Sequence, residues 1–193
     1  MPRIRSVAVF CGSQRGKDPV FAESAQALGH GLVEAGIRLV YGGGRVGLMG
    51  VLADAVLAGG GEVVGVIPDF LMRREVSHSG VTKLLNADSM HGRKQRMFEL
   101  SDAFVSLPGG IGTLDETIEI ITWRQLGLHH KPVLLCDVDG SVQPLLATID
   151  AAIERGFASP QSRALFEVLD GVPAVLDRLE HLSVQQGGGG ERL

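Results

Sequence analysis

Short apolar segments alternate along this chain with segments of helical periodicity, and this alternation constrains the fold more than any other feature. The apolar segments span residues 6–10, 37–41, 62–67, 103–107, 133–136 and 165–169. Helical patterns span residues 19–35, 48–58, 91–100, 114–126, 142–155 and 173–184. The stretch 68–89 is expected to be irregular or short-helical. Buried strands separated by helices form parallel sheets, so we expect a single-domain α/β fold: a parallel sheet with helices on both faces.

Composition predicts one globular domain. The chain has 193 residues, of which 45 % are apolar and 21 % charged, and its formal net charge is -4. A chain of this length can bury a substantial core. We expect the domain to span residues 1–184 and a disordered tail to span 185–193, where 187–190 are all glycine. The acidic balance argues against a nucleic-acid partner, and no apolar run approaches the roughly 20 residues of a membrane span.

The first residues and the cysteines predict a cytoplasmic protein. The apolar segment at residues 7–10 is too short for a signal peptide. Cys11 and Cys136 lie far apart and form no C-x-x-C motif. They are interpreted as reduced thiols.

Three turns rich in glycine or small residues follow three of the expected strands, at residues 11–13, 42–44 and 108–110. In parallel sheets, ligands bind beyond the carboxyl ends of the strands. The third turn begins the run Pro-Gly-Gly-Ile-Gly-Thr-Leu-Asp-Glu, which leads from a strand into a helix. Free N–H groups and the helix dipole at such a junction favour a phosphate. The phosphate site predicted from these turns comprises Gly12, Ser13, Gly43, Gly44, Gly109, Gly110 and Gly112.

Glu116 admits two interpretations. Thr113 and Glu116 have the T-x-x-E spacing of a capping box, in which both side chains satisfy backbone N–H groups. Glu119 lies one turn further on and nearly on the same side of the expected helix, at roughly 100° per residue. Two carboxylates beside an anion site make sense where positive charge develops during reaction. Glycosidic cleavage does this through an oxocarbenium-like sugar, and Glu119 is therefore included in the site.

A basic segment, Met-His-Gly-Arg-Lys-Gln-Arg at residues 90–96, places three cations at the start of an expected helix. The helix dipole disfavours cations there, so an anionic ligand would relieve the conflict. A solvated basic face is an equally supported interpretation. His91 is interpreted as a surface or capping residue. No spacing of His, Cys, Asp or Glu is typical of a metal site, and no serine nucleophile elbow is present.

The run Gly42-x-Gly44-x-x-Gly47 matches the dinucleotide-binding fingerprint, and Asp69 stands where the ribose-binding acid would stand. The run follows the second expected strand, whereas the fingerprint usually follows the first. A tight turn between a strand and a helix is the simpler interpretation, and NAD binding is kept as the weaker one.

These motifs together make the chain similar to the LOG family, the cytokinin-activating nucleoside 5′-monophosphate phosphoribohydrolases, often labelled "lysine decarboxylase". The similarity runs from Val7 to about Leu182 and includes P-G-G-x-G-T-x-x-E at residues 108–116 and M-H-x-R-K at 90–94. Further matching segments lie at residues 9–13, 41–50, 65–68, 121–127 and 131–133. No lysine context here suggests a Schiff base to pyridoxal phosphate.

The resemblance implies a Rossmann-like fold, usually dimeric, and hydrolysis of AMP or an N6-substituted AMP to the free base and ribose 5-phosphate. It makes Arg93 and Glu116 the catalytic pair. The residues that it implies at or near the nucleotide are Glu75, Lys94, Gly109, Gly110, Gly112, Thr113, Asp115 and Thr122. No cofactor and no metal are expected, since hydrolysis of an N-glycoside requires only water and placed charges.

Two other classes of function stay open at this point. One is a nucleotide-binding module that binds AMP without turnover. The other is an NAD-linked oxidoreductase, which saturable NAD binding would reveal.

The pattern of residues 114–126 also predicts a homodimer. Leu114, Ile118 and Ile121 fall on one helical face, and Ile120 and Trp123 fall towards the opposite face. A helix that is apolar on two sides needs two covering surfaces. We expect these to be the sheet and a partner chain, with cover by the segment 68–90 as the alternative.

Overall fold

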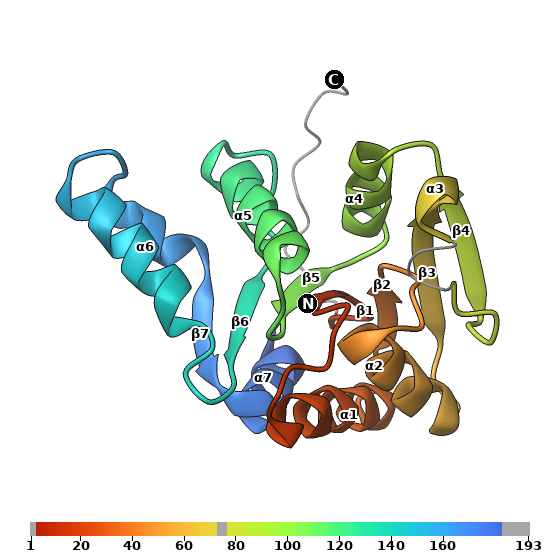
Figure 1. Cartoon of the computed structure of the whole chain (residues 1–193). Helices are drawn as coiled ribbons and strands as arrows, with labels where there is room; N and C mark the ends of the chain where they lie inside the picture. The colour runs from red at the N-terminus through yellow and green to blue at the C-terminus, as the bar shows by residue number, and fades with distance from the viewer. Residues whose placement is uncertain (1–2, 73–76, 183–193) are drawn as a thin grey trace.

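The computed structural model describes residues 3–72 and 77–182, which form one seven-stranded parallel sheet with helices on both faces (Figure 1). The strands are β1 (Ser6–Phe10), β2 (Arg38–Tyr41), β3 (Val63–Pro68), β4 (Lys83–Ala87), β5 (Ala103–Ser106), β6 (Val133–Asp137) and β7 (Glu167–Asp170). The helices are α1 (Pro19–Glu34), α2 (Gly47–Ala58), α3 (Asp69–Met72), α4 (Met90–Glu99), α5 (Ile111–Gln125), α6 (Gln143–Glu154) and α7 (Gly171–His181), with a 3-10 helix η1 (Pro160–Leu165). The expected α/β architecture is confirmed.

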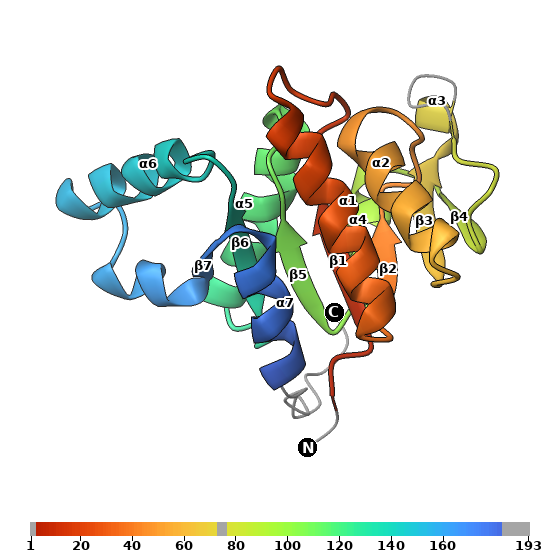
Figure 2. The same cartoon turned by 90° about the horizontal axis from the view of Figure 1, so that it is seen from below.

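The helices divide between the two faces of the sheet. Helices α1, α2 and α7 cover one face, and α4, α5 and α6 cover the other (Figures 1 and 2). On the first face, Leu28 of α1 and Leu52 of α2 are fully buried against the strands. On the second face, Met97 of α4 and Ile120 of α5 pack on Phe104 of β5. Apolar burial on both faces explains why the strands read as continuous apolar runs.

The six expected strands are present, and β4 was missed within the stretch expected to be irregular. Its sequence, Lys-Leu-Leu-Asn-Ala, is short and partly polar, and its residues are mostly exposed or half-buried. The strand lies at the edge of the sheet, where β3 is its one partner among the described strands. An edge strand needs fewer apolar residues than a central one, so the apolar-run criterion misses it.

Helix α5 begins at Ile111, three residues earlier than expected, and this overturns the capping box. Gly110 is the N-cap residue, with φ -94° and ψ -157°, and no side chain caps the helix. The first backbone bond of the helix runs from the N–H of Leu114 to the carbonyl of Gly110 at 3.1 Å. Thr113 therefore lies inside the first turn, and Glu116 lies beyond it, so the two residues do not form a cap.

The expected burial of α5 is correct in part. Ile120 and Ile121 are both buried, so the face shared by Leu114, Ile118 and Ile121 is covered at Ile121. Leu114 and Ile118 remain 45 % and 39 % exposed. Leu71 and Met90, from the described part of the 68–90 segment, line the same cavity as Ile111 at the start of α5.

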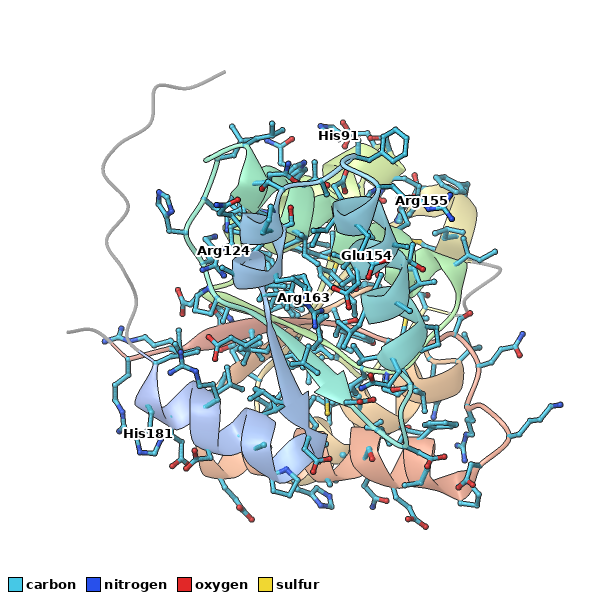
Figure 3. The ribbon with its side chains drawn as sticks, turned by 90° about the vertical axis from the view of Figure 1, so that its left-hand side faces the viewer. His91, Arg124, Glu154, Arg155, Arg163 and His181 are labelled. Carbon is cyan, nitrogen blue, oxygen red and sulfur yellow. The ribbon has the colours of Figure 1, made fainter. Side chains whose placement is uncertain are left out.

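Polar side-chain contacts connect α5, η1 and α6 on the second face of the sheet. Arg124 of α5 donates from Nη1 to the carbonyl of Leu165 in η1 at 3.0 Å, and Arg163 of η1 pairs with Asp150 of α6 at 3.3 Å. Figure 3 shows this side of the molecule, with Arg124 and Arg163 labelled. Within the described residues, no helix is both long and apolar enough to span a bilayer.

The strand order β4-β3-β2-β1-β5-β6-β7 contains one reversal of direction, between β1 and β5. The chain moves outward from β1 to β4 and then returns to place β5 on the other side of β1. In open parallel sheets, ligands bind in the crevice at this switch point, beyond the carboxyl ends of the strands. The turns after β1 and β5 lie there.

Candidate active site

The glycine turns after β1 and β5 meet at the switch point. The N–H of Gly12, after β1, donates to the carbonyl of Pro108, after β5, at 3.1 Å. The carbonyl of Gly12 accepts from the N–H of Leu48, at the start of α2, at 2.9 Å. These backbone bonds join segments that are far apart in the sequence, so the expectation that the turns share one edge is confirmed.

A cavity of about 280 Å³ opens beside these turns on the side of α4 and α5. Its lining brings together several of the predicted site residues. They are Ser13, Arg93, Gly110, Gly112, Thr113, Asp115 and Glu116. Loops after β1 and β5 form its base, α4 supplies one charged residue, Arg93, and α5 supplies two, Asp115 and Glu116.

Arg93 reaches this cavity from α4 and is buried, with 4 % of its surface exposed. Its Nη2 atom donates to the carbonyl of Gly42 at 2.9 Å. A Cβ atom on residue 42 would lie 1.9 Å from that nitrogen, so only glycine permits this approach. The turn after β2 therefore positions a cation at the cavity.

Neither interpretation of the basic segment holds for all three cations. Arg93 is buried, whereas Arg96 is exposed and pairs with Glu99 of the same helix at 2.8 Å, as a solvated face would. His91 is exposed (Figure 3), and Ser89 caps α4 by accepting from the N–H of Gly92 at 3.0 Å. The interpretation of His91 as a surface residue is confirmed.

Glu116 lines the same cavity from the second turn of α5 and is partly buried. Cys11, at the carboxyl end of β1, also lines it. Burial, and secondly the negative charge of Glu116, raise the pKa of the Cys11 thiol well above its ordinary value. The cavity thus contains the carboxyl groups of Asp115 and Glu116 and a thiol that is neutral at neutral pH.

The N-terminus of α5 forms part of the cavity wall. Ile111, Gly112 and Thr113 occupy the first turn and line the cavity, and no side chain caps the helix. The leading N–H groups of a helix have no partner within the helix, and the helix dipole adds positive potential there. A phosphate seated at this end would accept from these groups.

A second cavity, of about 450 Å³, adjoins the first on the side of α1. Ser13 and Gly110 line both cavities, so the two meet at the start of α5. Gly12 and Gly109, also predicted for the phosphate site, line the second cavity. Ser141, from the turn before α6, closes its far side.

Lys94 lies between α4 and α5. Its Nζ atom is 2.9 Å from Oδ2 of Asp115 and 2.8 Å from Oε2 of Glu119. Burial disfavours the charged ammonium, but the hydrogen bonds and charges of the two carboxylates outweigh it, so the pKa of Lys94 is raised. Among the described residues that line the first cavity, neither Lys94 nor Glu119 is found.

Other predicted site residues lie away from both cavities. Gly43 packs against Ile67 and Leu84, and Gly44 forms an isolated antiparallel β-bridge with Ser77. Thr122 is exposed on α5, where its hydroxyl donates to the carbonyl of Ile118 at 2.8 Å. Glu75 lies outside the described residues.

Sequence reasoning missed several residues of the first cavity. They are Cys11, Met49, Leu71, Met90 and Ile111. The position of Cys11, between a buried strand and a glycine, was a usable signal. The other residues are apolar, and a single apolar residue carries no sign of a cavity in the sequence.

The turn after β2 accounts for the dinucleotide-like glycines without a ligand. Gly43 and Gly47 have φ of 77° and 60°, and the carbonyl of Gly43 accepts from the N–H of His78 at 2.9 Å. Residues 42–44 are buried. The turn therefore fits the interpretation of a tight junction between a strand and a helix.

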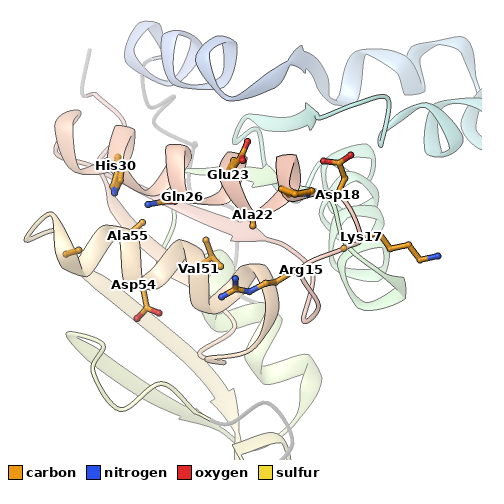
Figure 4. A pocket seen from close by; sticks show the side chains of 13 residues that line it. Arg15, Lys17, Asp18, Ala22, Glu23, Gln26, His30, Val51, Asp54 and Ala55 are labelled. Carbon is orange, nitrogen blue, oxygen red and sulfur yellow. The ribbon is translucent and has the colours of Figure 1, made fainter.

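The groove between α1 and α2 is larger, at about 630 Å³, but lies on the other face of the sheet (Figure 4). Polar and titratable side chains line it, among them Arg15, Glu23, His30 and Asp54, and all four are exposed. Within the described residues, no group of three or more His, Cys, Asp or Glu could hold a metal ion. By contrast, the charged residues Arg93, Asp115 and Glu116 line a single cavity, the one of about 280 Å³.

Comparison with solved structures supports the fold. The chain superposes on the molybdenum cofactor binding protein of Rippkaea orientalis with a TM-score of 0.68 at 20 % identity, covering 92 % of this chain and 96 % of that one. It superposes on the molybdenum cofactor carrier protein of Chlamydomonas reinhardtii with a TM-score of 0.67 at 18 % identity, with coverage of 92 % and 96 %. At this identity the likeness concerns the fold alone, which is Rossmann-like.

Comparison of sequences is more specific. A family described as "Possible lysine decarboxylase" matches residues 49–179. The chain is 48 % identical to the probable cytokinin riboside 5′-monophosphate phosphoribohydrolase LOGL2 of Oryza sativa subsp. japonica, over 95 % of this chain and 75 % of that protein. It is 47 % identical to cytokinin riboside 5′-monophosphate phosphoribohydrolase LOG7 of Arabidopsis thaliana, over 92 % of this chain and 82 % of that protein. With this degree of identity over nearly its whole described length, the chain belongs to the LOG family.

Proposed function

We propose that the protein hydrolyses the N-glycosidic bond of AMP or an N6-substituted AMP. Water adds its oxygen to C1′ of the ribose, the bond from C1′ to the purine nitrogen breaks, and a proton is transferred to the purine. The products are the free base and ribose 5-phosphate. The relatives named above carry this type of activity in their names.

One observation carries the proposal: an uncapped helix N-terminus, a carboxylate and a buried arginine line one cavity. The first turn of α5 supplies N–H groups that favour a phosphate. Glu116 follows one turn later on the same helix, and Arg93 lies on the wall formed by α4. A helical turn rises about 5.4 Å, which suits a ribose placed between its 5′-phosphate and C1′.

The chemistry follows from the two charges. An N-glycoside breaks through an oxocarbenium-like transition state, and the carboxylate of Glu116 either stabilises that cation or orients the attacking water. Arg93 either contacts the phosphate or assists the departing purine. In a partly closed cavity, these charges act more strongly than in bulk water. The neutral Cys11 thiol adds no competing charge.

The direct test is to incubate the purified protein with AMP and with N6-isopentenyl-AMP and to measure free base and ribose 5-phosphate. We expect one base released for each ribose 5-phosphate. The matching ribosides are the control, and we expect no hydrolysis of them, because phosphate binding energy can be used to reach the transition state. Equal rates on riboside and monophosphate would contradict this use of the phosphate.

The same experiment tests the alternative of a binding module, which would bind AMP and release no product. The NAD-linked alternative predicts saturable NAD binding. The buried turn at residues 42–44 offers no exposed glycine backbone to a pyrophosphate, and this favours the hydrolase.

We also propose that the protein acts as a homodimer. Ile111, Leu114 and Ile118 form an exposed apolar stripe on α5, at 87 %, 45 % and 39 % exposure. Apolar patches of this kind on a helix indicate a contact surface. Ile111 also lines the active-site cavity, so a second copy seated on the stripe would help to close the site. A cytoplasmic location is proposed from Cys11 and Cys136, both free and buried.

A further inference from the structure

Three consecutive glycines, at residues 42–44, form the turn that holds the buried arginine of the cavity. The carbonyl of Gly42 accepts from Nη2 of Arg93 at 2.9 Å. Glycines have no side chains with which to anchor a turn, and each loses more conformational freedom on ordering than any other residue. The glycine turn must therefore be fixed by contacts from outside it.

Two residues that precede β4, Ser77 and His78, supply such contacts. The N–H of His78 donates to the carbonyl of Gly43 at 2.9 Å, and Ser77 forms an isolated antiparallel β-bridge with Gly44. The glycine turn is thus in contact with the arginine at its first residue and with these two residues at its second and third. A displacement of Ser77 and His78 would be transmitted to the carbonyl that the arginine uses.

The imidazole of His78 fixes the position of these two residues. His78 is buried, with 4 % of its surface exposed. Its Nδ1 atom accepts from the N–H of Gly80 at 3.1 Å, so Nε2 carries the proton and donates to Oδ1 of Asp54 in α2 at 2.9 Å. A Cβ on residue 80 would lie 3.1 Å from Cε1 of the ring, so the backbone packs closely against it. Because both ring nitrogens are used, the ring is held in one orientation.

We infer that His78 is a positioning residue that acts on Arg93 through the glycine turn, and that Asp54 orients its ring. The inference deepens the proposed function and rests on it, because Arg93 is one of the two catalytic candidates of that function. Asp54 lines the groove between α1 and α2, and its side chain is 59 % exposed (Figure 4). The contacts therefore connect this groove with the active-site cavity on the other face of the sheet.

The first experiment changes the exposed end of these contacts, so that the core is left intact. Asp54→Ala removes the acceptor of the imidazole, and kcat/KM for AMP should fall about three- to tenfold, the effect of losing one hydrogen bond. Asp54→Asn keeps a side-chain oxygen, so we expect kcat/KM within about twofold of the native value. The assays are run well below the melting temperature, where a loss of stability alone does not lower the rate.

Two outcomes of this experiment would overturn the inference. One is a native rate in Asp54→Ala, because the ring would then need no partner in α2. The other is an Asp54→Asn protein as slow as Asp54→Ala, because the effect would then come from the lost charge and not from the hydrogen bond.

Glu23→Ala is the matched control. Glu23 is an exposed carboxylate that lines the same groove. We expect native kcat and KM. A loss equal to that of Asp54→Ala would show that the groove acts through its charge, and would count against a specific contact with His78.

The second experiment asks whether His78 acts through Arg93. His78→Ala should lose about 10- to 100-fold in kcat/KM, since a misplacement of about 1 Å in a catalytic group can cost about 10²-fold. Arg93→Lys cannot reproduce the contact of the guanidinium with Gly42. In a protein that already carries Arg93→Lys, His78→Ala should therefore cost less than about threefold more. Independent residues give additive losses, so the full additional loss in this background would refute the inference.

Two further measurements keep the inference open to refutation. If His78→Ala does not fold, Asp54→Ala takes its place in the cycle with Arg93→Lys, and additive losses would again refute the inference. If the native protein releases no base from AMP, the proposed function fails, and amide hydrogen exchange tests the contacts directly. The N–H of His78 should exchange about tenfold faster in Asp54→Ala than in the native protein. Unchanged exchange would refute the hold on the glycine turn.

Discussion

The two faces of the sheet use their apolar residues differently. On the face of α1, α2 and α7, the large apolar side chains of the helices are buried or half-buried, and α1 approaches α2 so closely that a Cβ on Gly29 would lie 2.7 Å from that of Ala55. On the face of α4, α5 and α6, several large apolar side chains remain exposed. They are Ile111, Leu114, Ile118, Leu126, Leu128 and Phe157.

The two faces of the sheet therefore have different roles. The first face closes the core, and its groove between α1 and α2 is lined by exposed charges (Figure 4). The second face carries the walls of the active-site cavity and leaves a helix surface free for a second chain. Stability should therefore depend most on the first face, and activity and assembly on the second.

The largest effect should follow Glu116→Gln on the second face. Gln cannot supply negative charge to an oxocarbenium or take a proton from water, so turnover of AMP should fall by about 10²–10⁴. Because Gly110 and not Thr113 caps α5, the substitution breaks no cap. AMP affinity by calorimetry and the melting temperature should be retained.

Glu119→Gln is the control for that variant. It removes a carboxylate one turn further along α5 and outside the cavity, so the loss should be smaller. Near-normal turnover in Glu116→Gln would return the catalytic role to Arg93 or Glu119.

The next effect concerns stability and the first face. Leu52 of α2 is fully buried, so Leu52→Ala should reduce the free energy of unfolding by about 2–5 kcal/mol. Leu126, at the end of α5, is 67 % exposed, and Leu126→Ala should change it by less than about 0.5 kcal/mol. Urea unfolding measures both. Equal losses would mean that the two faces do not differ in this way.

A charge on the exposed apolar stripe of α5 should weaken the proposed dimer. A glutamate at position 118 would be desolvated in an apolar interface, so Ile118→Glu should convert a dimer to a monomer in light scattering at micromolar concentration. Gln26→Glu, on exposed α1, should leave the dimer intact. A native protein that is already monomeric under these conditions would refute the dimer.

The smallest effect should come from the C-terminus. Deletion of residues 186–193, which lie outside the described residues, should lower the melting temperature by less than about 2 °C, or under about 1 kcal/mol for a domain of this size. Four consecutive glycines lose much entropy on ordering and bury no side chains. A clear loss of activity or melting temperature would show that this segment docks on the domain.

Local patterns were enough to predict most of the elements. Strand β1 was predicted with its observed bounds, and the helix predicted from residue 19 does begin there, where Asp18 caps α1 by accepting from the N–H of Val20 at 2.9 Å. Strand β4 could not be found this way, because pairing with a single neighbour requires little apolar character. The order of the strands was also not predicted, since it depends on which strands pair rather than on any one of them.

The residues of the site were likewise predicted only in part. Arg93, Thr113, Asp115 and Glu116 do line one cavity, although they come from two helices. Lys94 was assigned to the nucleotide site through the family resemblance and its position in the basic segment, and its partners on α5 could not be seen from its own surroundings.

The sequence by itself determined the alternation of elements, the glycine turns and the family, because these depend on neighbouring residues and on periodicity. The tertiary structure alone decided where α5 begins, which cation enters the cavity and which is already paired. Each of these depends on a contact between distant segments: Arg93 with Gly42, and Lys94 with Asp115 and Glu119. The T-x-x-E pattern was present in the sequence, yet the turn after β5 started the helix at Ile111, and Glu116 became part of the cavity wall.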